Sequence, residues 1–183
     1  MELNIPPEIA VAPVVHDLYS FAVEQRRFLE GLHMEFGVAS GGTLRKLRKL
    51  LPLSATLYGF DSFEGLPEPW FGYKKGTFAT PYRVELPNTV LVEGWFEVTV
   101  STFAKSHPFP VSLMHIDCDL YSSTLTVLNA FRNQIMPGTI VIFDELFGYE
   151  GFEDHEYRAL TEFARPFTTL ARWEAFRAAV RFE

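Results

Sequence analysis

The chain has 183 residues, 48% of them hydrophobic and 15% aromatic, which is enough for the core of one domain. Its net charge of −7 argues against nucleic acid as a partner. No apolar run approaches the roughly 18 residues of a membrane span, the first residues lack a secretory-signal pattern, and the single cysteine excludes an internal disulfide. We therefore expect one cytoplasmic domain, with a helical segment at 1–33 and an α/β core at 34–183.

Helical and strand patterns alternate along the chain. Apolar residues at helical spacing predict a first helix over 14–32. Short apolar runs rich in β-branched residues predict five strands, and further helical patterns separate them. The predicted strands are 34–38, 56–60, 89–92, 111–116 and 139–143. The predicted helices are 44–51, capped by Thr43, and then 95–105, 123–135 and 154–163.

Two further segments complete this pattern. Residues 62–88 are rich in proline and glycine, which predicts an irregular lid or substrate loop. Residues 168–182 are predicted as two short strands joined by a turn near 174–177. Strands alternating with helices indicate a Rossmann-like α/β fold, with a mostly parallel seven-stranded sheet, helices on both faces and an antiparallel C-terminal strand. Ligands of such sheets bind at the carboxyl ends of the strands.

Acidic residues follow two of the predicted strands. Asp117 and Asp119 come after 111–116, and Asp144 and Glu145 come after 139–143. Neighbouring carboxylates repel one another and are costly to desolvate, so such a cluster usually persists because a hard cation neutralises it. The sequence therefore predicts a cation site. His115 and Cys118, which lie among these residues, are interpreted as packing residues.

A glycine-rich turn at 35–43 joins the first core strand to the next helix. Glycines there let the backbone approach a ligand closely, but the spacing is neither that of a phosphate loop nor that of a dinucleotide-binding turn. Asp61 follows Gly41 by 20 residues, at the end of the second strand, where an acidic residue can bind a ribose. The pair favours nucleoside binding, and turn capping is the alternative.

Several sequence blocks occur together in one order. They are Glu-Phe-Gly-Val-Ala-Ser-Gly-Gly-Thr at 35–43, Gly-Phe-Asp-Ser-Phe-Glu-Gly-Leu-Pro at 59–67, Glu-Gly-Trp-Phe-Glu at 93–97, Ile-Asp-Cys-Asp-Leu-Tyr-Ser-Ser-Thr at 116–124, Pro-Gly at 137–138 and Asp-Glu at 144–145. Over about residues 30–163 the chain thus resembles the macrocin O-methyltransferase family, which includes sugar O-methyltransferases of macrolide and aminocoumarin biosynthesis. The resemblance implies the class I S-adenosylmethionine-dependent methyltransferase fold.

The resemblance also implies the residues of the site. The cofactor S-adenosylmethionine would be bound by Glu35, Gly37, Val38, Ser40, Gly41, Thr43, Asp61, Ser62, Gly94, Trp95, Phe96 and Asp117. The implied catalytic residues are Asp117 and Asp119, with Asp119 as general base, and Asp117, Asp144 and Glu145 would bind Mg²⁺ or another divalent cation. Glu145 departs from the aspartate usual in the family, which leaves open an altered metal geometry, a preference for Mn²⁺ or Ca²⁺, or loss of the metal.

The expected activity is methyl transfer to a hydroxyl of a small acceptor, with a sugar or glycosylated natural product favoured and no role for nucleic acid or membrane. Segments 62–88 and 146–157 are predicted to contact the acceptor through Trp70, Phe71, Tyr73, Phe78, Tyr82, Phe147, Tyr149 and Phe152. Two alternatives stay open: a catalytically reduced cofactor-binding protein acting through a partner, and a domain that binds another nucleotide. A homo-oligomer whose second subunit completes the site is a further option.

Overall fold

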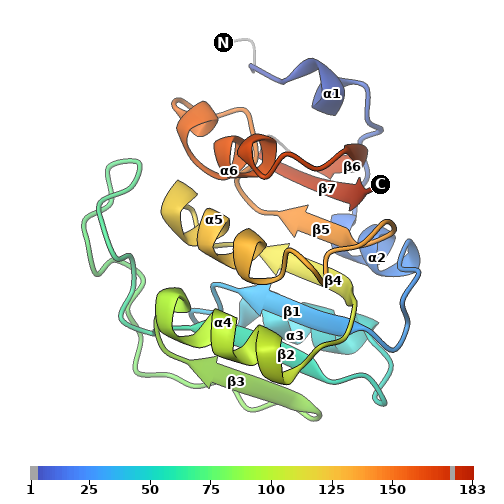
Figure 1. The fold of residues 1–183 in the computed structure, drawn as a ribbon. Coiled ribbons are helices and arrows are strands. Elements are labelled where there is room, and N and C mark those ends of the chain that lie inside the picture. The colour runs from blue at the N-terminus through green and yellow to red at the C-terminus, as the bar shows by residue number, and fades with distance from the viewer. Residues whose placement is uncertain (1–3, 174–175) are drawn as a thin grey trace.

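Seven strands form one sheet at the centre of the molecule. The computed structural model describes residues 4–173 and 176–183. The strands are β1 (Leu32–Phe36), β2 (Leu57–Asp61), β3 (Thr89–Glu93), β4 (Val111–Ile116), β5 (Ile140–Phe143), β6 (Phe167–Trp173) and β7 (Arg177–Phe182). Their order is β3-β2-β1-β4-β5-β7-β6, with β1 to β5 parallel and β7 antiparallel to both β5 and β6 (Figure 1). This confirms the predicted Rossmann-like fold class.

Helices cover both faces of the sheet. They are α1 (Pro7–Ala10), α2 (Leu18–Glu24), α3 (Gly42–Leu50), α4 (Phe96–Ser106), α5 (Tyr121–Ala130), the 3₁₀ helix η1 (Phe152–Asp154) and α6 (Glu156–Glu162). Helices α4, α5 and α6 lie on one face, and α2 and α3 lie on the other (Figure 1). Within 4–173 and 176–183, no helix is long and apolar enough to cross a membrane.

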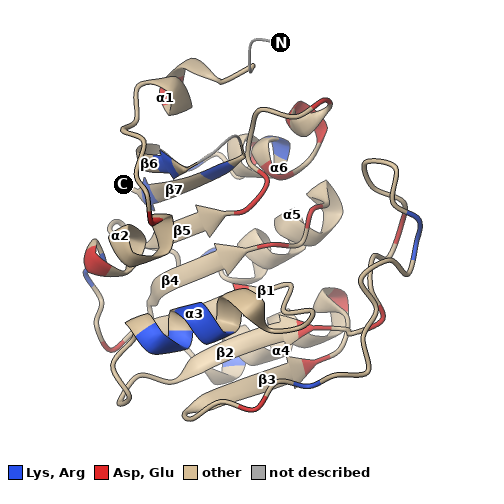
Figure 2. Cartoon of the chain, turned by 180° about the vertical axis from the view of Figure 1, so that it is seen from behind, with Lys and Arg blue, Asp and Glu red and all other residues tan. Residues whose placement is uncertain are grey.

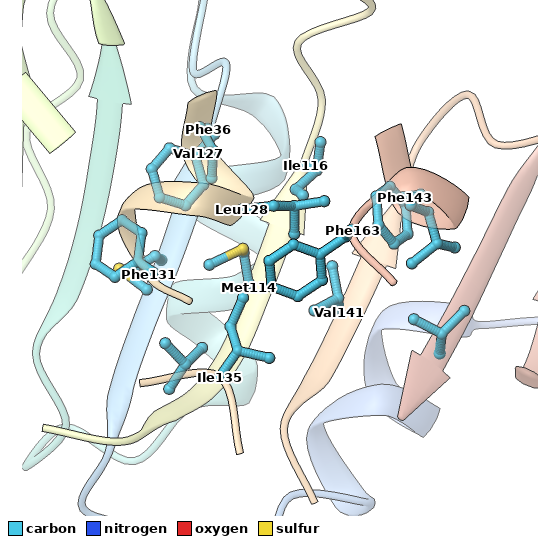
Figure 3. Close-up of a cluster of buried hydrophobic side chains, with 14 of the residues drawn as sticks. Phe36, Met114, Ile116, Val127, Leu128, Phe131, Ile135, Val141, Phe143 and Phe163 are labelled. Carbon is cyan, nitrogen blue, oxygen red and sulfur yellow. The ribbon is translucent and has the colours of Figure 1, made fainter. Parts of the chain in front are cut away.

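The larger core lies between the central strands and the layer of α4, α5 and α6. Met114 of β4 and Val141 of β5 project toward Leu128 of α5, and Phe163 closes the cluster beyond α6 (Figure 3). All six residues of β4 are buried, because both faces of a central parallel strand are covered by helices. This two-sided burial explains why the strands read as continuous apolar runs, and each predicted core strand falls within two residues of an observed one.

The predicted helix over 14–32 is wrong in its length. Asp17 begins the shorter helix α2 by accepting the Ser20 N–H at 3.2 Å, and Gln25 ends it. Val14 instead makes a parallel bridge with Arg172, far away in the sequence. Residue 32, the last of the helical pattern, is the first of β1, so periodicity joined two different elements. The core of the domain therefore begins two residues before the predicted boundary at 34.

Smaller differences occur at other helix ends. Gly41, at a φ of +79°, is the N-cap of α3, so Thr43 lies inside the helix and is not its cap. The helix predicted over 123–135 begins two residues earlier and ends at Ala130, and that over 154–163 is divided between η1 and α6. The predicted turn near 174–177 falls partly on residues 174 and 175, which lie outside the described residues, and Arg177 already belongs to β7.

Candidate functional site

A cavity of about 430 Å³ opens at the carboxyl ends of the parallel strands. Ten of the predicted site residues line it: Gly37, Val38, Asp61, Ser62, Gly94, Trp95, Phe96, Asp117, Asp119 and Glu145. Five others do not: Glu35, Ser40, Gly41, Thr43 and Asp144. The fold thus gathers residues from the ends of five strands around one space, as the position of the motifs predicts.

Asp61 holds the turn after β1 in place. Its Oδ2 accepts the N–H groups of Val38 and Ala39 at 2.8 and 2.7 Å, and its Oδ1 accepts that of Phe63 at 2.7 Å. The turn-capping interpretation of Asp61 is therefore confirmed. A carboxylate has about four lone-pair positions, so capacity for a further donor remains, and the role of Asp61 in ribose binding stays a prediction.

Three of the carboxylates that line the cavity lie close together. Asp117, Asp119 and Glu145 each place an oxygen within 4.8 Å of the other two. Figure 2 shows the acidic segments that follow β4 and β5, from which these residues come. Asp119 has a φ of +64°, a left-handed conformation that aspartate and asparagine tolerate better than most residues. Cys118, between the two aspartates, is buried and also borders the cavity.

The protonation of this group reflects its burial. Burial and the charge of Asp144 raise the pKa of Asp119 to about 7 and that of Glu145 to about 12. Burial likewise raises the pKa of Asp117 well above its ordinary value. The Oε2 atom of Glu145 is buried and has no hydrogen-bond partner in the described part of the chain. An oxygen-only set of carboxyl groups fits a hard divalent cation, which would displace their protons on binding.

Asp144 has different partners. Its Oδ1 accepts from the Tyr19 hydroxyl at 2.9 Å and from Arg177 Nε at 2.5 Å, and its Oδ2 accepts from Arg177 Nη2 at 2.8 Å. Burial alone would raise the pKa of Asp144, but His115 and Arg177 hold it well below its usual range. Ligation of a cation by Asp144 would require this ion pair to loosen, and its role as a ligand stays a prediction.

His115 and Glu35 lie beneath the cavity as a buried pair. His115 Nδ1 is 3.0 Å from Glu35 Oε1, and His115 Nε2 is 3.5 Å from Asp144 Oδ1. Burial alone would lower the pKa of His115, but these carboxylates raise it to about 10. His115 is thus buried, as expected, and also carries a positive charge that offsets part of the acidic group. Glu35 is buried and does not line the cavity, and its contact with the cofactor stays a prediction.

The sequence patterns did not indicate Glu156, a fully buried residue that begins α6. Its Oε2 accepts the N–H of Glu145 at 3.2 Å, whereas its Oε1 has no hydrogen-bond partner within the described residues. A glutamate in the first turn of a helix is ordinarily a solvated residue, so spacing carried no signal for it. Arg177 and Tyr19, the partners of Asp144, were missed for a different reason, because each lies far from Asp144 in the sequence.

Aromatic side chains form the remaining wall. Of the eight predicted acceptor contacts, Trp70, Phe71, Tyr73, Phe78 and Tyr149 line the cavity, and Phe176 joins them. Phe147 and Phe152 are buried in the core, and Tyr82 is exposed and bonded to Arg45. We call residues 62–88 the arm, since this segment projects beside the body of the molecule in Figure 1. The arm supplies four of the six aromatic rings.

Comparisons with known proteins agree with this geometry. The family model described as macrocin-O-methyltransferase (TylF) matches residues 77–177, more than half of the chain. The structure of the calicheamicin methyltransferase CalS11 is similar over 89% of this chain and 76% of its own, with 27% identity and a TM-score of 0.70. The O-methyltransferase NovP covers 89% of this chain and 77% of its own, with 22% identity and a TM-score of 0.64.

A more distant structure supports the fold alone. The Streptococcus mutans protein SMU.1697c, solved in complex with SAH, covers 91% of this chain and 95% of its own, with 13% identity and a TM-score of 0.52. Comparison with curated protein sequences finds no significant match. The glycine turn and Asp61 precede the segment that the family model matches, so their assignment depends on their position in the fold.

Proposed function

The chain belongs to the macrocin O-methyltransferase family, and from this premise we propose that it transfers a methyl group from S-adenosylmethionine to a hydroxyl of a sugar with the help of a divalent cation. It is an O-methyltransferase with the Rossmann-like fold of its structural neighbours. The observation that carries the proposal is that one cavity is lined both by the strand ends predicted to bind the cofactor and by a group of three carboxylates.

Two groups of residues that line the cavity differ in their chemistry. The turn after β1, together with Gly94, Trp95 and Phe96, offers backbone groups and aromatic surface suited to a nucleoside. Asp117, Asp119 and Glu145 offer only oxygen atoms. A sulfonium bound between these two groups of residues would present its methyl group toward the carboxylates. Holding the acceptor oxygen, the methyl carbon and the sulfur in line is then the main contribution of the protein to the rate.

Asp119 is the proposed general base. An alcohol is a weak nucleophile because its pKa lies far above 7, so its proton must leave as the oxygen attacks the methyl group. The new O–CH₃ bond forms as the CH₃–S bond breaks, the proton passes to the Asp119 carboxylate, and S-adenosylhomocysteine is released. With a pKa of about 7, Asp119 is partly ionised at neutral pH and matched to this task.

The proposed cation is held by Asp117 and Glu145, and it lies beside Asp119, which stays free to take the proton. When bound, a divalent cation supplies positive charge that lowers the pKa of a hydroxyl beside it. Asp144, whose charge is neutralised by Arg177, is proposed to support the geometry of this group. The Glu145 carboxylate lies within this group, although the glutamate side chain is longer than the aspartate usual in the family.

The acceptor class follows from two observations. CalS11, which covers 89% of this chain with 27% identity, is described as a TDP-rhamnose 3'-O-methyltransferase. Here the carboxylates face a cavity whose aromatic wall suits the apolar face of a pyranose. We therefore propose a deoxysugar, linked to a nucleotide or to a natural product, as the acceptor.

The first test is methyl transfer itself. The protein incubated with S-adenosylmethionine, Mg²⁺ and TDP-rhamnose is expected to yield S-adenosylhomocysteine and a singly methylated sugar, measured by mass spectrometry. Catechol serves as a flat aromatic comparator, because an aromatic wall could also accept an aryl diol. Turnover of catechol together with no turnover of TDP-rhamnose or simple rhamnosides would contradict the sugar proposal.

The second test concerns the cation. Glu145→Gln is expected to weaken Mn²⁺ binding by roughly 10-fold or more, measured by titration calorimetry, because one anionic ligand is lost. Glu150→Gln, which changes an exposed glutamate nearby, is the matched control and should bind Mn²⁺ like the parent protein. Exhaustive chelation should stop turnover while S-adenosylhomocysteine binding survives. Undiminished turnover in the chelated protein would refute the metal proposal.

A further inference from the structure

Four buried polar atoms without hydrogen-bond partners gather where the arm meets the body. Within the described residues these are Trp70 Nε1 of the arm and, from the body, Glu145 Oε2, Tyr149 OH and Glu156 Oε1. Three of the four residues border the cavity, and Glu156 bonds the backbone of Glu145 directly behind it. A buried polar atom without a partner is costly, so a group of four indicates a place for polar groups of a ligand.

Trp70 and Tyr149 are held together by packing. Trp70 is only 8% exposed and packs with Leu66 and Leu120, while its ring lies 6.1 Å from that of Tyr149, edge to face. Burial raises the pKa of Tyr149, and Glu156, Glu145 and Asp119 raise it further, whereas the indole N–H of Trp70, which lies beside the hydroxyl, lowers it. The Tyr149 hydroxyl therefore lies in the field of the same carboxylates that form the acidic group.

The tip of the arm fixes the orientation of Trp70. Trp70 and Tyr73 exchange two backbone hydrogen bonds, of 3.0 and 2.7 Å, around a two-residue turn. Both turn residues, Phe71 and Gly72, have positive φ, the signature of a tight hairpin turn. The Trp70 ring is stacked on Tyr73 at 5.9 Å. With its ring surrounded by these contacts, Trp70 offers the ligand the N–H of its indole edge.

We propose that Trp70 and Tyr149 are specificity residues that hydrogen-bond an oxygen of a polyhydroxylated acceptor beside Glu145, and so select sugars over flat aromatic diols. This inference rests on the proposed function and deepens it. The indole N–H can only donate, whereas a carboxylate that is ionised beside a bound cation can only accept. A polyol hydroxyl satisfies both, because it accepts from Trp70 and donates to a carboxylate.

The test uses two variants that keep an aromatic side chain, although phenylalanine at position 70 also has a smaller ring than the indole. Trp70→Phe and Tyr149→Phe each remove one polar atom, and each is expected to raise KM for TDP-rhamnose about 5- to 100-fold, because the partner oxygen loses its hydrogen bond. We expect a much smaller change in kcat and unchanged affinity for S-adenosylhomocysteine. Tyr58→Phe, which removes the hydroxyl of a ring that packs on Phe103 and His107 outside the cavity, is the matched control.

A second measurement does not depend on the variants' stability. The indole N–H resonance of Trp70, identified by its absence in Trp70→Phe, is expected to move downfield when TDP-rhamnose is added to the protein with S-adenosylhomocysteine. Turnover of TDP-rhamnose with unchanged KM in both variants, or an unmoved indole resonance at saturation, would overturn this inference alone. No turnover of any sugar by the parent protein would overturn the proposed function, and the inference with it.

Discussion

Replacing Asp119 with asparagine is expected to lower kcat by about 10²- to 10⁴-fold, the usual contribution of a general base. Asparagine is nearly the same size as aspartate and tolerates the φ of +64° at this position, so the backbone should not move. What changes is the capacity to accept the proton of the acceptor hydroxyl. Affinity for S-adenosylhomocysteine, measured by calorimetry, should stay within about 2-fold of the parent value, because Asp119 is not among the residues expected to bind the cofactor.

The pH dependence provides an independent check on Asp119. Burial raises the pKa of its carboxyl to about 7, so protonation below that pH removes the base and the rate should fall as pH falls. A bound cation would shift this limb to lower pH. The limb should be absent from the residual activity of Asp119→Asn. Asp154→Asn, at an exposed aspartate, is the control, and a parent-like rate in Asp119→Asn would exclude Asp119 as the base.

Replacing Gly37 with alanine is expected to abolish cofactor binding, with a loss of at least about 3 kcal/mol in folding stability. Gly37 has a φ of +92°, and a Cβ there would lie 1.7 Å from the carbonyl oxygen of Asp117. Its N–H donates to the Phe60 carbonyl at 3.0 Å, so the residue joins the ends of β1 and β2 while touching the end of β4. A methyl group must therefore push these strand ends apart.

Gly42→Ala is the matched control for this change. Gly42 is the first residue of α3, and a Cβ there would meet no atom within 4 Å, so we expect parent-like binding and equal or slightly higher stability. Thermal unfolding and S-adenosylhomocysteine titration of both variants separate the two expectations. If Gly37→Ala bound the cofactor as the parent protein does, the close approach of β1 to β4 would not be required for the site.

The acidic group shows how far position in sequence determines a site. Asp117, Asp119 and Glu145 follow buried strands, and parallel strands end at one edge, so their meeting could be predicted. The ion pair of Asp144 could not. Arg177 comes from β7, which runs antiparallel to β5, and the register of that pairing depends on packing across the whole sheet. A pattern within one strand contains no information on that register.

The N-terminal segment shows the opposite limit. Helical spacing over 14–32 joined a short helix to the first residue of β1, because an apolar period of three to four residues can arise by chance across a loop. Val14 pairs with Arg172 of β6 instead of continuing a helix, and this bridge holds the chain against the edge strand of the sheet. Local propensity is a weak preference that such tertiary contacts override.

The sequence by itself determined the parallel α/β sheet, the family and the edge at which the site lies. Two-sided burial forces strands into continuous apolar runs, and those runs, with the turns after them, are local features of the chain. Only the tertiary structure decided that Asp144 is neutralised by Arg177, that Glu156 lies behind Glu145, and that Trp70 faces Tyr149. The physical reason is that charge, burial and hydrogen-bond satisfaction depend on distances between residues far apart in the chain.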